Sequence, residues 1–159
     1  MEWNVEASLS HLRRIRKPKP APPYQCARHV HAALEAGGLR LPPIESRHPE
    51  DGPSACDYGR PLEQAGFAVF YDNLNEDLAS TSYAPAGGDI TIFMPITSEI
   101  VSEIAIHLHR HGHIQMYDDV SAAWISDFRQ GDFFPDRDTR IGYDRFQIYR
   151  HAHASARAR

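Results

Sequence analysis

Cysteine is scarce in this chain of 159 residues, which has only Cys26 and Cys56 and no CxxC pair. Disulfide scaffolds and cysteine-rich zinc sites need several closely spaced cysteines, so neither is indicated. No apolar run approaches the roughly 20 residues that would cross a bilayer. The first residues carry early acidic side chains and no apolar core of signal-peptide length, so we expect synthesis in the cytoplasm without a secretory signal.

An excess of positive charge is missing as well. The chain has 17 basic and 21 acidic residues, a formal net charge of −4. Because nucleic-acid phosphates favour clearly basic surfaces, no nucleic-acid partner is expected. The basic residues gather near the two ends, at 13–19 and 150–159, and we interpret them as parts of solvated tails.

The composition is that of an ordinary globular protein, with 42% hydrophobic and 24% charged residues. A chain of this length suits one domain with a real hydrophobic core. We therefore expect a single monomeric domain over 1–159, with its core at about 22–150 and flexible basic tails at 1–20 and 151–159.

Hydrophobic periodicity predicts helices in the first half of the chain and strands after them. The expected fold class is α+β, with an antiparallel sheet of consecutive strands. Helices are predicted over 5–15, from 26 to a glycine pair at 37–38, and over 96–109. A further helix is predicted over 54–65, where Pro61 makes it either two short pieces or one helix that starts later. Strands are predicted over 67–71, 89–94, 112–117, 123–128 and 143–150.

Cys26 follows a proline-rich lead-in and stands in the first turn of a predicted helix. Unpaired N–H groups and the positive end of the helix dipole favour a thiolate at such a position, and the thiolate is the reactive form of cysteine. The alternative is a small buried cysteine that only packs.

His113 and Asp127 are candidates to complete a catalytic site with Cys26. The polar residues 118–121 have the length of a hairpin loop between two predicted strands. A hairpin centred at Val120 places Asp127 directly opposite His113 and on the same face of the sheet. The carboxylate would then orient the imidazole, leaving its other nitrogen to take the proton of the Cys26 thiol.

These residues, in this order, resemble the papain-like NlpC/P60 and CHAP peptidoglycan hydrolases. The match consists of Cys26 at the start of the first core helix, the Gly88-Asp89 strand, the Gly112-His113-Ile114 strand and a polar residue, Asp127, on the next strand. It covers roughly 22–150. Two features depart from the family pattern: Gln25 precedes the cysteine instead of Asp or Asn, and residues 95–110 form an insertion.

The resemblance implies a papain-like fold, with N-terminal helices packed on an antiparallel sheet, and cleavage of an amide bond in the peptide stems or cross-links of bacterial cell wall. It also implies a role for each residue: Cys26 as nucleophile, His113 as general base and Asp127 as the third polar residue. The backbone N–H of Cys26 would help to form an oxyanion hole, with Tyr24 or Gln25 as a further donor. No metal or organic cofactor is implied.

A cell-wall hydrolase of one domain, without a signal peptide, is similar to two kinds of protein. These are the amidase effectors of type VI secretion systems and phage endolysins, and we favour the effector. It would be delivered to the periplasm of a target cell, and a cognate immunity protein would plug its cleft.

Three other interpretations stay open. The first keeps the papain-like fold but acts on proteins, as a hydrolase or deamidase; the second is a non-catalytic binding domain. The third is a metal site built from the alternating histidines 107, 109, 111 and 113, since imidazole suits zinc, copper and nickel. Cys56 is interpreted as a packed cysteine, with a disulfide to Cys26 as the alternative under oxidising conditions.

Overall fold

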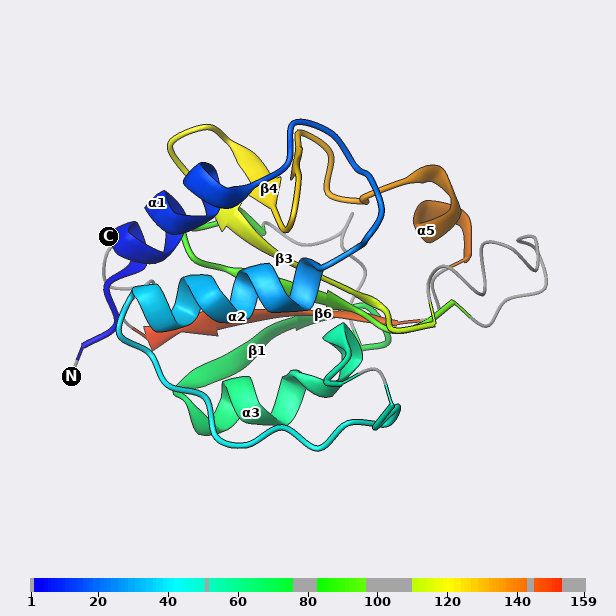
Figure 1. The fold of residues 1–159 in the computed structure, drawn as a ribbon, viewed down its shortest axis with the longest axis horizontal. Coiled ribbons are helices and arrows are strands. Elements are labelled where there is room, and N and C mark those ends of the chain that lie inside the picture. The colour runs from blue at the N-terminus through cyan, green and yellow to red at the C-terminus, as the bar shows by residue number, and fades with distance from the viewer. Residues whose placement is uncertain (1, 51, 76–82, 97–109, 143–144, 153–159) are drawn as a thin grey trace.

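The computed structural model describes residues 2–50, 52–75, 83–96, 110–142 and 145–152 (Figure 1). A twisted antiparallel sheet carries the first three α-helices on one side, so the expected α+β class is confirmed. In chain order the elements are α1 (Val5–Ile15), α2 (Cys26–Ala36), η1 (Ala55–Asp57), α3 (Gly59–Gln64), β1 (Phe67–Asp72), β2 (Ile90–Phe93), β3 (His113–Asp118), β4 (Ala123–Ile125), β5 (Arg129–Gln130), α5 (Arg137–Gly142) and β6 (Phe146–His151).

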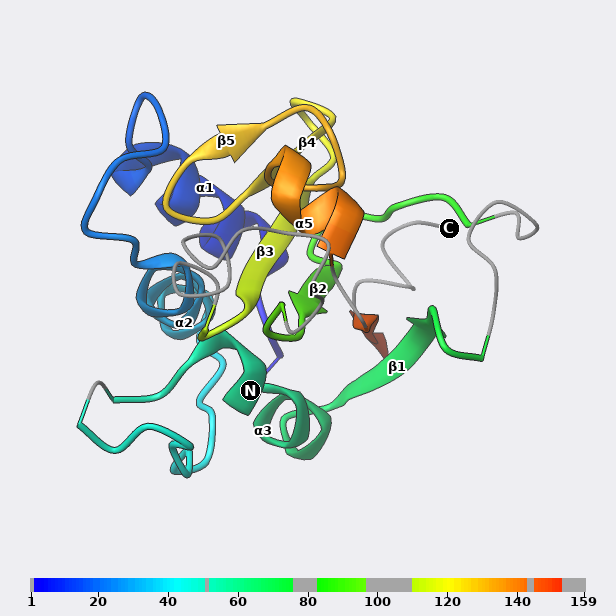
Figure 2. The same ribbon diagram turned by 90° about the vertical axis from the view of Figure 1, so that its right-hand side faces the viewer.

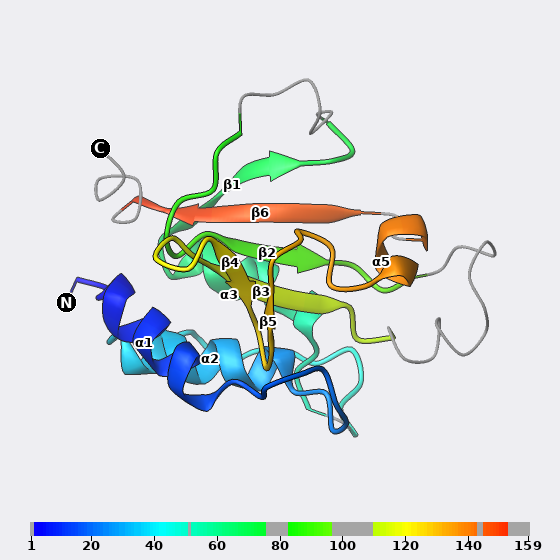
Figure 3. The same cartoon turned by 90° about the horizontal axis from the view of Figure 1, so that it is seen from above.

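The six strands lie in the order β1-β6-β2-β3-β4-β5 (Figure 3). The expectation that consecutive strands pair is therefore wrong for β1 and β2. The last strand, β6, enters between them and pairs with Phe67–Asp72 on one side and with Ile90–Phe93 on the other. A long connection separates β1 from β2 in the chain, which leaves room for β6 between them.

The N-terminal segment belongs to the core, so the predicted flexible tail over 1–20 is wrong. Helix α1 begins after Asn4, whose side chain accepts a hydrogen bond from the Ala7 N–H. Its inner face is fully buried, and Trp3 before it is 1% exposed and donates to Ser8 Oγ. Of the basic residues that suggested a tail, Arg14 and Arg16 are exposed, whereas Arg13 is partly buried.

Helix α2 packs closely against the beginning of α1. A Cβ atom at Gly37 would lie only 2.2 Å from Ser8 Oγ and 2.6 Å from the Asn4 carbonyl oxygen, so this position needs glycine. Gly38 follows at φ +86°, a conformation that ends the helix as the glycine pair predicts. The buried face of α2, Val30, Ala33 and Leu34, joins the main hydrophobic cluster.

The predicted helix over 54–65 forms as two pieces, η1 and α3. Ser54 caps the first piece through a capping box with Asp57. Pro61 lies in the first turn of α3, where its missing N–H costs nothing. Gly66 ends this segment at φ +102°.

Three buried or nearly buried aspartates hold arginines from distant parts of the chain. Arg13 binds both carboxylate oxygens of Asp118 at 2.9 and 2.6 Å, and Arg150 binds those of Asp89 at 2.8 and 2.7 Å. Arg145 binds Asp72 at 2.6 Å. The interpretation of Arg13 and Arg150 as solvated side chains is therefore wrong, because each has a buried carboxylate as its partner.

Most of the predicted helix over 96–109, and the tail from residue 153, lie outside the described residues. In the part of the chain that the structure describes, no helix is both long and apolar enough to span a membrane.

We predict that Asp118→Asn lowers the free energy of unfolding by about 2 kcal/mol at pH 7. Burial alone would raise the pKa of Asp118, but hydrogen bonds from Arg13 and Ser121 lower it to about 2. A depressed pKa stabilises the fold above the ordinary carboxyl range, and this stabilisation disappears as the pH falls from about 4 toward 2. Urea unfolding across this pH range measures the effect.

The matched control is Asp132→Asn, which changes an exposed aspartate. It should leave the free energy of unfolding within about 0.5 kcal/mol of the unmodified protein. An equal loss in both variants, or a loss for Asp118→Asn that does not shrink toward low pH, would contradict the assigned ion pair.

Candidate active site

The start of α2 lies against the edge of β3 (Figure 2). Strand β4 pairs with Met116, Tyr117 and Asp118, so the first half of β3 extends past the end of β4. There the Ile114 N–H lies near Cys26 Sγ and acts to lower the pKa of the thiol. The first residue of α2 thus lies beside the strand that carries His113.

Cys26 is held as a neutral thiol in this arrangement. Burial raises the pKa of the thiol to about 11, and the negative charge of Asp127 adds to the rise. The N–H groups of Ile114, Ala27 and Cys26 act in the opposite direction without outweighing burial. The expectation that the helix start favours a resting thiolate is therefore wrong, because desolvation exceeds the effect of the helix N-terminus.

His113 is the first residue of β3 and is 8% exposed. Its ring lies between those of Phe93 and Phe128, at centroid distances of 6.1 and 6.0 Å. The structure thus brings the strand that carries His113 to the helix that carries Cys26. Cys26 Sγ lies near the backbone N–H of Ile114, the residue immediately after His113.

The predicted position of Asp127 opposite His113 is wrong. The β3–β4 register pairs Met116 with Ile125 and Asp118 with Ala123, so the hairpin is centred half a residue beyond Val120. The chain then turns back after Ile125 to form β5, with the Ser126 N–H donating to the Phe128 carbonyl. Asp127 consequently lies in a turn rather than on a strand beside His113.

Asp127 instead meets the start of α2. Its carboxylate is 1% exposed and accepts a hydrogen bond of 2.9 Å from the Gln25 N–H. Lys17 Nζ lies 3.5 Å from the same oxygen, and Ser126 Oγ donates to the other at 3.3 Å. A carboxylate is well placed there because the N-terminus of a helix carries a partial positive charge.

Lys17 is a site residue that the sequence did not reveal. Its backbone N–H donates to the Asp127 carbonyl at 2.7 Å, and its ammonium donates to the carbonyls of Ala21 and Pro23. It therefore ties the proline-rich lead-in of α2 to the turn that carries Asp127. A lysine surrounded by other basic residues gives no sequence signal for such a role.

Tyr24 and Gln25 precede the cysteine, and they differ in exposure and in hydrogen bonding. Tyr24 is 55% exposed beside the helix start. The Gln25 N–H is bound to Asp127, whereas its side chain makes no capping hydrogen bond. Any contribution of Gln25 to an oxyanion hole would therefore come from its side-chain amide.

Tyr58 is a second residue that sequence reasoning missed. It is 3% exposed at the end of η1, and its hydroxyl lies 2.9 Å from His31 Nδ1 on α2. Burial, together with the nearby Cys26, raises the pKa of Tyr58 to about 12, so the hydroxyl stays protonated. Tyr58 thus joins the end of η1 to α2 through His31.

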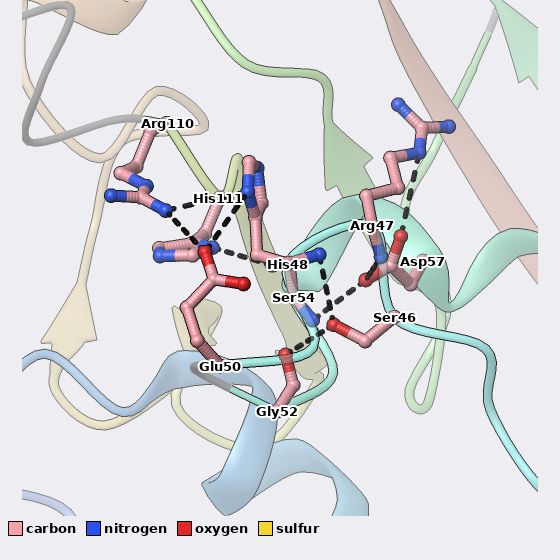
Figure 4. A network of polar contacts seen from close by, with 9 residues as sticks. All are labelled: Ser46, Arg47, His48, Glu50, Gly52, Ser54, Asp57, Arg110 and His111. Atoms are coloured by element: carbon pink, nitrogen blue, oxygen red, sulfur yellow. Dashed lines mark hydrogen bonds and ion pairs between the residues drawn. The ribbon is translucent and has the colours of Figure 1, made fainter.

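The histidine array is only partly described, since His107 and His109 lie outside the described residues. His111 Nδ1 lies 2.5 Å from Ser54 Oγ, within a polar network that also contains His48 and Arg110 (Figure 4). Among the described residues no cluster of three histidine, cysteine or acidic side chains could hold a metal ion.

Cys56 is a packed cysteine, as interpreted, with 6% of its surface exposed. Its N–H donates to the His111 carbonyl at 3.1 Å, which anchors η1 to the segment entering β3. Both cysteines are free thiols in this structure.

No family model and no curated protein matches the chain. Solved structures do match, among them two forms of one complex. A chain of the native type VI effector–immunity complex Tae3–Tai3 from Ralstonia pickettii matches with 24% identity and a TM-score of 0.64, over 94% of this chain and 99% of that one. The two share one fold. The selenomethionine form of that complex matches with 26% identity and a TM-score of 0.61, over 90% of this chain and 98% of that one.

We predict that alkylation of Cys26 by iodoacetamide in a Cys56→Ser background follows a titration well above pH 9. Burial and Asp127 both oppose ionisation of the thiol, so Asp127→Asn should move the titration to lower pH. Mass spectrometry of the alkylated protein against pH measures both curves.

Asp132→Asn, which removes a distant exposed charge, should leave the curve unchanged. An apparent pKa near 7 in the unmodified protein would instead indicate a resting ion pair between the Cys26 thiolate and a protonated histidine.

Proposed function

We propose that this protein is a cysteine amidase or endopeptidase that cleaves an amide bond in the stem peptides or cross-links of peptidoglycan. The observation that carries the proposal is Cys26 at the start of α2, near the Ile114 N–H of β3 and so next to the residue that follows His113. A nucleophile at a helix start beside a histidine on a strand is the arrangement that thiol-dependent acyl transfer needs.

In the proposed mechanism His113 takes the thiol proton as Cys26 Sγ attacks the scissile carbonyl carbon. The carbonyl π electrons move to oxygen, and the resulting oxyanion faces the N–H of Cys26 at the helix N-terminus. The tetrahedral intermediate then collapses: the C–N bond breaks and His113 returns the proton to the leaving amine. Water hydrolyses the thioester by the same steps and releases the carboxylic acid.

A thiol with a pKa of about 11 suits this order of events. It is a poor nucleophile until a base removes its proton, so proton transfer and attack occur together once the substrate is in place. Asp127 is the proposed third polar residue of the catalytic site, beside Cys26 and His113. Tyr24 and the side chain of Gln25 are the proposed further contacts to the substrate or the oxyanion.

We further propose that the protein is an antibacterial effector of a type VI secretion system. The likeness to effector–immunity complexes over nearly the whole of both chains supports this proposal. It implies delivery to the periplasm of a target cell and a cognate immunity protein that covers the site. An endolysin with the same chemistry, or a papain-like enzyme acting on proteins, would use the same residues.

Purified peptidoglycan should be digested by the protein under reducing conditions, releasing fragments with new amine and carboxyl ends. Cys26→Ala and His113→Ala should each lower the rate by at least about 10³-fold, because both remove a group that acts on the reacting atoms. Cys56→Ser should retain activity. Mass spectrometry of the fragments identifies the bond, and digestion that survives Cys26→Ala would refute the proposal.

Two substitutions of Asp127 separate orientation of the histidine from support of the helix. Asp127→Asn keeps an acceptor for the Gln25 N–H but loses the charge, whereas Asp127→Ala loses both. If the charge orients His113, both variants should lose about 10² or more in kcat. If Asp127 mainly supports α2, Asp127→Asn should retain the kcat and the thermal stability of the unmodified protein, whereas Asp127→Ala should lower both.

A further inference from the structure

A cavity of about 890 Å³ opens on the same side of the sheet as Cys26. Strands β2 and β6 form its floor, and the loop 43–47, η1 and α3 form its walls. Ile92 and Tyr149 on the floor belong to the hydrophobic cluster against which Cys26 packs. Helix η1 separates the two places, because Cys56 lines the cavity whereas Tyr58 lies beside Cys26.

The cavity begins a short way along the sheet from His113. His113 pairs with Phe93 on β2, and the next residue, Met94, lines the cavity and donates its N–H to the Arg145 carbonyl at 2.9 Å. Two strand spacings separate β3 from β6, which amounts to about 10 Å. An extended peptide covers that distance in about three residues.

Two arginines among the lining residues can receive a carboxylate. Arg145 binds Asp72 through Nη2, and its side chain is 42% exposed, which leaves part of the guanidinium accessible. Arg60 is exposed on α3 and makes no ion pair with any residue that the structure describes. A guanidinium presents paired N–H groups that match a carboxylate.

Acidic residues line the same cavity. They would repel a ligand whose only charge is negative. Glu63 is three residues after Arg60, on the same face of α3, and Glu45 lies on the loop. Neither has an ion-pair partner in the described part of the chain. The remaining pair, Arg47 and Asp57, is joined at 3.4 Å. The cavity therefore offers free charges of both signs.

We propose that this cavity binds an amino-acid head, a carboxylate and an ammonium on one carbon. The identity of the ligand rests on the proposed function: it is the free end of a diamino acid in a stem peptide. This end would lie about three residues' length from the bond that is cut. Arg60 and Arg145 face the carboxylate, and Glu63 and Glu45 face the ammonium. The cavity then fixes which amide bond reaches Cys26.

The test measures binding without catalysis, in the Cys26→Ala protein by calorimetry. Its probe is a synthetic stem tetrapeptide with γ-linked D-glutamate and a meso-diamino acid, in three forms: with the free amino-acid head, with this head carboxyl as a carboxamide, and with this head amine acetylated. The free form should bind at least about fivefold more tightly than either capped form, since each capping removes one charge-assisted interaction.

Arg60→Gln should remove the preference for the free carboxylate, and Glu63→Gln the preference for the free amine. Arg40→Gln, an exposed arginine outside the cavity, should change neither. Arg145 is left unchanged because its ion pair with Asp72 also supports the fold.

Equal binding of all three peptides, or equal effects of Arg60→Gln on all of them, would overturn the proposal. Digestion of peptidoglycan by the unmodified protein would in that case leave the proposed function intact. Charge-selective binding without digestion would support the site while the amidase proposal fails.

Discussion

The packing of the start of α2 against the first half of β3, which brings Cys26 Sγ near the Ile114 N–H, is the contact on which the arrangement of this site depends. It forms because β4 ends early and the chain turns back into β5, leaving the first half of β3 free to meet a helix start. The same turn carries Asp127, which accepts the Gln25 N–H. The short β4–β5 hairpin thus leaves the first half of β3 free on one side. It also holds the start of α2, which packs there, through Asp127.

Lys17 and Arg13 extend this support to the N-terminal segment. Lys17 joins the lead-in of α2 to Asp127 through its ammonium and its backbone. Arg13, one turn earlier on α1, binds the buried Asp118 at the other end of β3. The segment before the cysteine helix is therefore a structural part of the site, and two of its basic residues, Arg13 and Lys17, lie against specific carboxylates.

Local patterns predicted much of the fold correctly. Helix 5–15 was recognisable from four apolar residues at helical spacing. Pro61 left two possibilities for 54–65, two short pieces or one helix that starts later, and the structure has two pieces. The position of β6 between β1 and β2 could not be predicted, because strand order depends on pairing between residues far apart in the chain. The partners of Arg13 and Arg150 were hidden for the same reason.

The candidate site shows the same division. Cys26 at a helix start and His113 on a strand were predictable from neighbouring residues, and the structure brings their elements together. The place of Asp127 was missed for two reasons. The hairpin is centred half a residue beyond Val120, since Ala122 adopts φ 52° and the loop spans residues 119–122, and the chain leaves β4 after Ile125 to turn into β5. These two departures place the carboxylate at the start of the helix instead of opposite the histidine.

This placement of Asp127 creates an opposition between stability and reactivity. A carboxylate at the start of α2 stabilises the helix, but its charge also disfavours the Cys26 thiolate. Lys17 lies 3.5 Å from the carboxylate and offsets part of that charge. The resting thiol is thereby kept neutral. In the proposed mechanism His113 removes its proton only when substrate is bound, so substrate binding, rather than the resting state of the cysteine, would start the reaction.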